Sequence, residues 1–173
     1  MKRFIILLAL MGVMLAVSPS TAMAGQHEGG VSATVTPAFI AIGTTPQFTG
    51  YGTVDLDTTG NLPIGQTGST SAGAAFLVEN TGTKTADWAI VGGNSADWTI
   101  ASAAGADAYK HSWDDAASSG VPTSPTSLHS SQPLATGVTA TTVLPVWLTL
   151  DMPISGLFTD TQNLPITITA TIP

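Results

Sequence analysis

An acidic residue stands next to a tryptophan twice within a short stretch, as Ala86-Asp87-Trp88 and as Ala96-Asp97-Trp98. A carboxylate beside an exposed aromatic ring can form a sugar-binding pair. Two carboxylates can also hold a hard cation such as calcium. The third interpretation is structural, because successive residues of a strand point to opposite faces, which places the tryptophans in the core and the aspartates in solvent. The strands that carry the repeat decide between these uses.

The two copies of the motif are expected to face each other across a hairpin. With residues 93–95 as a three-residue loop, position 88 lies opposite 100 and position 90 opposite 98. Both tryptophans then share one face, and each buries about 200 Å², so this face is interpreted as core. A shift of register by one residue would separate the tryptophans and favour the sugar-binding interpretation. The four core candidates are Trp88, Ile90, Trp98 and Ile100.

The other polar residues show no pattern typical of an active site. The three histidines, His27, His111 and His129, lack metal-ligand spacing, and the sequence has neither an HExxH nor a GxSxG motif. Asp114 and Asp115 are the candidates for a metal site, because they are adjacent carboxylates and few cationic side chains are present to pair with them. We therefore expect no enzymatic activity and no required cofactor, with calcium at Asp114 and Asp115 as the metal to test.

The first 24 residues have the organisation of a signal peptide. Lys2 and Arg3 form a basic start, residues 4–17 are an apolar run, and Ala22-Met23-Ala24 is a small-x-small cleavage signal. The apolar run is shorter than the ~20 residues that a membrane-spanning helix needs. We expect cleavage after Ala24, export without membrane insertion, and a secreted or cell-surface protein.

Removal of this leader makes the chain strongly acidic. The leader holds two of the four basic residues, so 2 lysines remain against 11 acidic residues and the formal net charge becomes −9 (2 − 11). Such a surface repels nucleic acid and anionic membranes. The sequence has no cysteine, which excludes disulfides and cysteine-ligated metal sites.

Period-two alternation predicts about eight strands and no helix. Val146, Leu148 and Leu150 alternate with Trp147 and Thr149, and Trp147 is a further core candidate. Many short strands between turn residues are typical of an antiparallel β-sandwich, Ig-like or jelly-roll, which we expect as a single domain over residues 25–173. The expected strands cover residues 31–36, 38–43, 74–80, 86–92, 96–100, 107–113, 141–153 and 164–172.

Two segments are rich in turn-forming residues and are expected to be loops. Residues 57–73 contain four glycines and a proline, and residues 116–137 are rich in serine, threonine and proline. The second loop is interpreted as a solvated insertion at one end of the sandwich. An O-glycosylated or partner-contacting loop is the alternative.

The order of these strands and turns resembles a group of secreted β-sandwich proteins from microbial surfaces. The stretches that carry the resemblance are VENTGTKTADWAI, SADWTI, GADAYKHSW, VWLTLDMP and LPITITATI. The group includes subunits similar to the biofilm-matrix protein TasA, camelysin and the donor-strand archaeal pilins. The sequence departs from it in lacking a camelysin-type metal motif and a sortase or lipobox anchor. The resemblance implies a non-enzymatic subunit of an extracellular filament or of a surface or biofilm matrix.

The alternative function is a carbohydrate-binding or adhesive module. Trp113, Tyr109 and Tyr51 are the aromatic residues that would stack on a glycan. Burial of all four tryptophans would count against this interpretation, and two aromatic side chains exposed in one plane would favour it.

The start of the mature chain is a candidate for strand donation between subunits. Gly29 and Gly30 precede an alternating segment in which Val31, Ala33 and Val35 share one face. These three side chains can fill the apolar groove of a neighbour while the backbone completes its sheet. Such head-to-tail donation gives a homopolymer. The alternative is that the segment folds into its own sheet and the protein stays monomeric.

Overall fold

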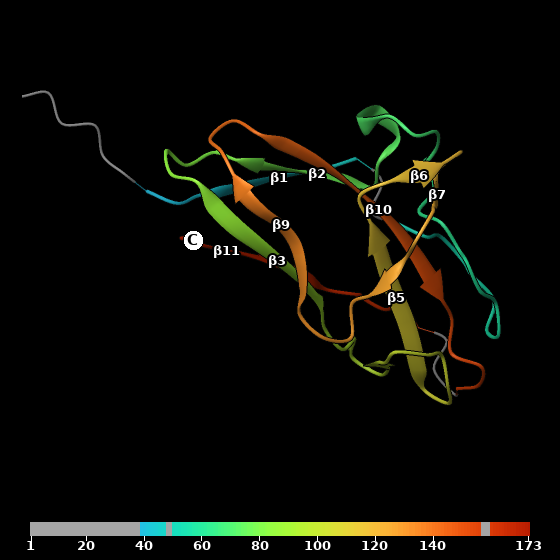
Figure 1. The fold of residues 1–173 in the computed structure, drawn as a ribbon. Coiled ribbons are helices and arrows are strands. Elements are labelled where there is room, and N and C mark those ends of the chain that lie inside the picture. Colours follow the sequence, from blue (N-terminus) through green and yellow to red (C-terminus); the bar gives the residue numbers. More distant parts are fainter. Residues whose placement is uncertain (1–38, 48–49, 157–159) are drawn as a thin grey trace, which may run out of the picture. The chain divides into compact units, whose positions relative to one another are not determined.

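The strands form where apolar and β-branched residues alternate with polar ones, and most of them belong to two mainly antiparallel sheets (Figure 1). The computed structural model describes residues 39–47, 50–156 and 160–173, which belong to one compact unit, Pro37–Pro173. The signal peptide expected at residues 1–24 and the donor candidates Val31, Ala33 and Val35 lie outside the described residues.

The larger sheet has the strand order β1-β2-β10-β5-β4, with β8 also paired to β5. All of its pairs are antiparallel except β4 with β5. Its strands are β1 (Ile42–Pro46), β2 (Phe76–Asn80), β4 (Thr99–Ile100), β5 (Ala108–Asp114), β8 (Thr126–Ser127) and β10 (Val143–Asp151).

The smaller sheet has the order β11-β3-β9 and is wholly antiparallel. It consists of β3 (Ala86–Gly92), β9 (Gln132–Val138) and β11 (Ile166–Thr171). A separate hairpin joins β6 (Ala117–Ser118) to β7 (Val121–Pro122), and Ser71–Gly73 form the 3-10 turn η1. No helix in the described ranges is long and apolar enough to cross a membrane.

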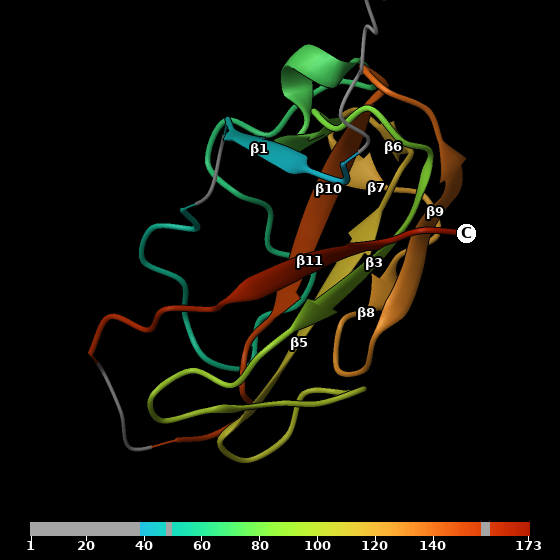
Figure 2. The same cartoon turned by 90° about the vertical axis from the view of Figure 1, so that its left-hand side faces the viewer.

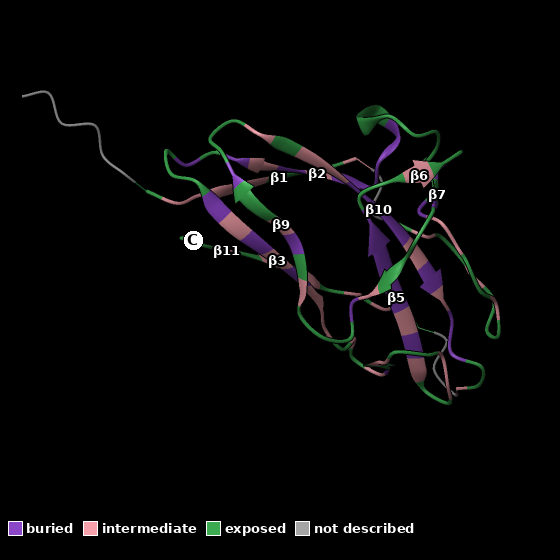
Figure 3. Ribbon diagram, in the orientation of Figure 1, coloured by how far each residue is buried: buried purple, intermediate pink, exposed green. Residues whose placement is uncertain are grey.

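One apolar cluster is shared by the inner faces of both sheets, which makes the fold a β-sandwich and confirms the predicted class. Phe76 and Val78 of β2 and Leu148 of β10 meet Trp88 and Ile90 of β3 in this cluster. The buried stretches of these strands stand out in Figure 3. The described residues form eleven strands rather than about eight, and four of the eleven, β4, β6, β7 and β8, are only two residues long.

The predicted hairpin between the two Ala-Asp-Trp motifs is wrong. β3 pairs with β11 and β9, whereas β4 runs parallel to β5. The reason lies in the connecting loop, where Asn94 Oδ1 accepts the N–H of Ile100 and Ser95 Oγ accepts that of Trp98. These side chains satisfy the backbone groups that a hairpin would have paired. The Trp98 ring consequently packs in a second cluster with Tyr109, Leu150 and Met152.

The serine- and proline-rich segment 116–137 is not a free loop. It contains β6, β7 and β8 and most of β9, and Leu128 and Leu134 within it are buried in the main cluster. Residues 57–73, by contrast, hold only the 3-10 turn η1 and an isolated bridge from Asn61.

Candidate functional site

A groove of about 1310 Å³ lies between two sheet edges that are free of a strand partner within the described ranges. β1 ends the larger sheet and β11 ends the smaller one, and residues of both strands line the same groove. Figure 2 looks onto this side of the domain. The volume exceeds the roughly 300–1,000 Å³ of a typical small-ligand pocket. The groove is therefore wide enough for a polypeptide segment.

The lining of the groove is mainly apolar at the strand edges. Leu148 and Leu150 of β10 reach it from the sandwich interior. Side chains on the two edge strands are only partly buried against the core, so a further apolar surface would cover them. The lining residues from the edges are Ile42, Thr44 and Pro46 on β1 and Ile166, Thr167 and Ile168 on β11.

Two polar rings meet in the lining of the groove. Tyr51 Oη lies 2.8 Å from His111 Nε2, and the two rings pack edge to face with centroids 5.8 Å apart. The Tyr109 ring also lies near the imidazole, with centroids 6.4 Å apart, and its hydroxyl donates to the carbonyl of Gly93 at 2.5 Å. The His111 side chain is 2% exposed, and its Nδ1 has no hydrogen-bond partner in the described part of the chain.

Burial keeps this cluster uncharged. It lowers the pKa of His111 to about 4 and raises that of Tyr109 to about 12. Burial, with a smaller contribution from Tyr109, also raises the pKa of Tyr51. Imidazole and phenols are therefore neutral across the physiological range, so the cluster offers hydrogen bonds but no charge and no poised base.

The core candidates named from the sequence occupy three different places. Trp88 and Ile90 lie in the main cluster, and Trp98, which is 7% exposed, lines the groove. Ile100 is partly buried beside both clusters. Trp147 is 2% exposed but belongs to neither cluster, because it alternates with the inward-facing residues of β10. The same strand also contacts β7 and η1.

The two aspartates of the repeated motif do not converge on a common site. The Asp87 carboxylate accepts the N–H of Gly137 at 2.8 Å. Asp97 exchanges two hydrogen bonds with Gln162, one from its own N–H and one to its carboxylate. Each carboxylate thus fixes a neighbouring loop.

Asp114 and Asp115 also point to different surroundings. Asp114 accepts hydrogen bonds from the N–H groups of Ala116 and Ser124 and from the Thr123 hydroxyl, whereas Asp115 is exposed. Burial raises the pKa of Asp114, but these hydrogen bonds outweigh it and hold the pKa below its ordinary value. Among the described residues, no group of three or more histidine, aspartate or glutamate side chains could hold a metal ion. Calcium binding at Asp114 and Asp115 stays a prediction. The Asp114 carboxylate already accepts three hydrogen bonds within the domain.

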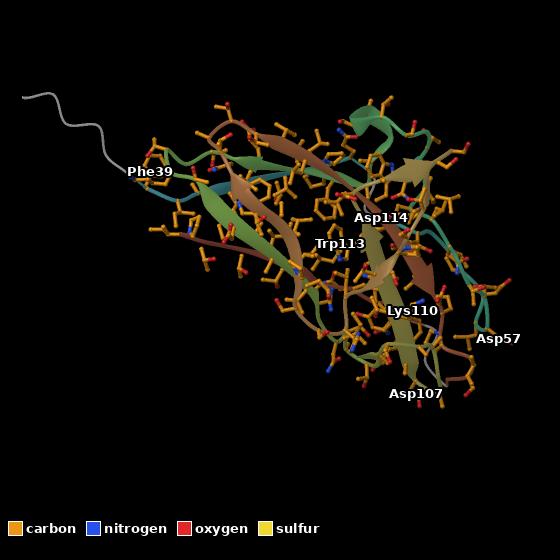
Figure 4. All side chains as sticks on the ribbon, in the orientation of Figure 1. Phe39, Asp57, Asp107, Lys110, Trp113 and Asp114 are labelled. Carbon is orange, nitrogen blue, oxygen red and sulfur yellow. The ribbon has the colours of Figure 1, made fainter. Side chains whose placement is uncertain are left out.

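The aromatic residues proposed for glycan stacking are largely enclosed. Trp113 is 7% exposed and Tyr109 is fully buried, while Tyr51 packs against His111. Figure 4 shows Trp113 and Asp114 on β5, with Trp113 on the side that faces β3 and β9. All four tryptophans are buried. By the criterion set from the sequence, this burial counts against a stacking platform.

The groove itself was not foreseen from the sequence, although one signal pointed to its lining. Tyr109, His111 and Trp113 alternate with polar residues along the expected strand, so the sequence places His111 on the apolar face. Its partner Tyr51 lies 60 positions away, and no local pattern connects the two.

Comparison of the chain with protein-family models, with curated proteins and with solved structures finds no match. The features of the molecule that bear on function are therefore the groove, its two free strand edges and its neutral polar cluster.

Proposed function

We propose that this protein is an exported, non-enzymatic structural subunit of an extracellular filament or surface matrix. In this proposal, residues 31–36 of one copy occupy the groove of the next. The observation that carries it is the groove between β1 and β11, which has mainly apolar side chains along both strands and opens onto two strand edges that lack a partner among the described residues. Unpaired edges beside an apolar trough are costly in water, and a donated strand covers both at once.

The segment at 31–36 has the dimensions and pattern of such a strand. Six extended residues span roughly 20 Å, the length of a six-residue strand such as β11. Val31, Ala33 and Val35 alternate with Ser32, Thr34 and Thr36, so one face is apolar and suits the groove.

The uncharged cluster of His111 and the two tyrosines also suits a structural role, although the carboxylates of Asp55 and Asp160 line the same groove. His111 and the two tyrosines carry no charge at neutral pH, so they can stay buried beneath a mainly apolar strand without an ionic partner. The resemblance to secreted filament subunits, together with the signal peptide expected at residues 1–24, supports an extracellular location.

Two matched double variants of the mature chain, residues 25–173, test this proposal. Val31→Asp with Val35→Asp places charges on the face that enters the groove, whereas Ser32→Asp with Thr34→Asp places the same charges on the opposite face. We expect the first variant to stay a folded monomer and the second to polymerise like the unmodified chain, as seen by electron microscopy and sedimentation.

Three results would contradict the proposal. The unmodified mature chain could remain monomeric at high concentration. The two variants could polymerise equally well. The Val31 and Val35 variant could also unfold as a monomer, which would show that the segment belongs to its own sheet.

A further inference from the structure

The free edge of β11 presents a regular row of backbone groups. The N–H of Gly93 donates to the carbonyl of Pro165, so the odd-numbered residues of β11 form their hydrogen bonds toward β3 in this antiparallel register. The N–H and C=O groups of Ile166, Ile168 and Ala170 therefore point to the free edge. All three residues retain an N–H to donate.

The free edge of β1 is shorter and interrupted. The N–H of Thr81 donates to Ala41, and the N–H of Gln47 donates to Ala75, so here the odd-numbered residues pair with β2. Ile42, Thr44 and Pro46 remain at the free edge, and Pro46 has no N–H. Proline at an edge strand is a common block to further pairing.

From this asymmetry we infer that the donated strand pairs with β11, antiparallel to it, and extends the smaller sheet from three strands to four. This inference rests on the proposed function and adds the edge and the direction of pairing. Its second support is the position of the chain's own start relative to the two edges.

The described chain begins at the end of the sandwich that carries the turn between β2 and β3. The carbonyl of Phe39 accepts the N–H of Thr83 in that turn, and Thr171 pairs with Asp87 close to it. A chain's own segment 31–36, folded back into its groove, would have to run toward this turn and therefore parallel to β11. Antiparallel pairing with β11 thus requires a second copy.

The direction of pairing also decides the type of assembly. A strand antiparallel to β11 runs toward Ile166, so the donor's domain lies beyond that end of the sandwich. The acceptor's own first residues leave at the opposite end, beside Thr83. Donation and acceptance at opposite ends give an open head-to-tail chain. Pairing in the parallel direction would bring donor and acceptor starts to the same end and favour a closed, swapped dimer.

Single cysteines can report the pairing directly, because the sequence contains none. Thr34→Cys marks the outward face of the donor strand. Thr169→Cys marks the outward face of β11, and Thr45→Cys marks the matching face of β1; both threonines are exposed. Both also occupy non-hydrogen-bonded positions on their free edges, where opposed Cα atoms are about 4.5 Å apart and suit a disulfide.

We expect mature chains carrying Thr34→Cys to form disulfide-linked dimers with chains carrying Thr169→Cys, or with Thr167→Cys or Thr171→Cys if the register is shifted by two. Chains carrying Thr45→Cys should give no such product. Cross-linking to Thr45→Cys in filaments would overturn the inference and leave the proposed function standing. If neither filaments nor cross-links form, both the pairing at β11 and the proposed function are overturned. An internal disulfide in a monomer carrying Thr34→Cys and Thr45→Cys would also overturn both.

A pair of proline variants gives an independent test with the same chains. Ala170→Pro and Thr44→Pro each remove an N–H that points to a free edge, so both leave the native ladders intact. Ala170→Pro is expected to raise the critical concentration for polymerisation by about tenfold or more, and Thr44→Pro by less than about twofold. The opposite ranking, in variants with unchanged melting temperatures, would contradict pairing at β11.

Discussion

The buried imidazole of His111 is the residue whose protonation most affects this domain. Its ring packs against Tyr51 and Tyr109, two neutral groups. The charged residues of its own strand, Lys110 and Asp114, alternate to the other face of β5. Protonation would therefore place an uncompensated charge in an apolar setting.

This position predicts a loss of stability at mildly acidic pH. The pKa of His111 is about 4 in the folded domain and 6.5 in the unfolded chain, so the unfolded chain binds more protons between these values. The free energy of unfolding should fall as the pH falls from 6.5 to 4, by at most about 3 kcal/mol from this residue, and level off below. Urea unfolding of the mature chain along a pH series measures the slope.

His111→Gln should flatten that slope, whereas His129→Gln, at an exposed histidine, should leave it unchanged. Equal slopes in all three proteins would contradict the assignment. Asp114 does not interfere in this window, because its lowered pKa makes its contribution fall only at more acidic pH.

The adjacent carboxylates of Asp114 and Asp115 predict very different mutational effects. Asp114→Asn weakens three hydrogen bonds that fix residues 116–124 and should cost about 1–3 kcal/mol without any added cation. Asp115→Asn, at an exposed side chain, should stay within about 0.5 kcal/mol. Thermal unfolding with and without calcium measures both effects. A melting temperature that calcium raises, and that either substitution returns to the cation-free value, would show a cation site instead.

At the scale of elements, the sequence predicts strands better than it predicts their partners. The bounds of β3 match residues 86–92, because its alternation of buried and intermediate residues is a local pattern. The isoleucines of β11 face the core and its threonines face solvent for the same reason. Which strands pair depends on loop side chains such as Asn94, and a short strand such as β4 forms only alongside a longer strand, here β5. The periodicity of the sequence indicates neither the loop hydrogen bonds nor the short strands.

The loop at residues 57–73 predicts a strong effect for one glutamine. Gln66 is 5% exposed, and its amide bonds both the N–H and the C=O of Leu148 and the carbonyl of Gly120. Gln66→Leu should cost about 3 kcal/mol, because three buried backbone groups lose their partner. It should also raise the rate of proteolysis within the loop, measured on the folded protein. Gln132→Leu is the control, since the side chain of Gln132 donates to the exposed hydroxyl of Ser130 rather than to buried backbone groups. Equal effects at the two positions would show that Gln66 does not pin the loop.

At the scale of the whole molecule, the groove is a product of long-range assembly. β1 and β11 lie at opposite ends of the described chain and meet only because the two sheets stack. The sequence predicts an apolar face on each strand, and hence the class of fold. Which strands are left at the edges follows from the pairing order, so the groove could not be predicted from the sequence.

The acidity of the mature chain predicts how its assembly responds to salt. Residues 25–173 carry a formal net charge of −9, and the proposed head-to-tail contact would bring such charges close together. Salt shortens the Debye length from about 30 Å at 0.01 M to about 8 Å at 0.15 M, so the repulsion between subunits weakens. The critical concentration for polymerisation should therefore fall as NaCl is raised over this range, measured by sedimentation of the mature chain. Comparing sodium chloride with calcium chloride at equal ionic strength separates charge screening from specific cation binding. A specific cation site would make calcium lower the critical concentration far more than sodium does. A critical concentration that rises with NaCl would show attraction between opposite charges at the contact, and would contradict an assembly held by apolar side chains and backbone pairing.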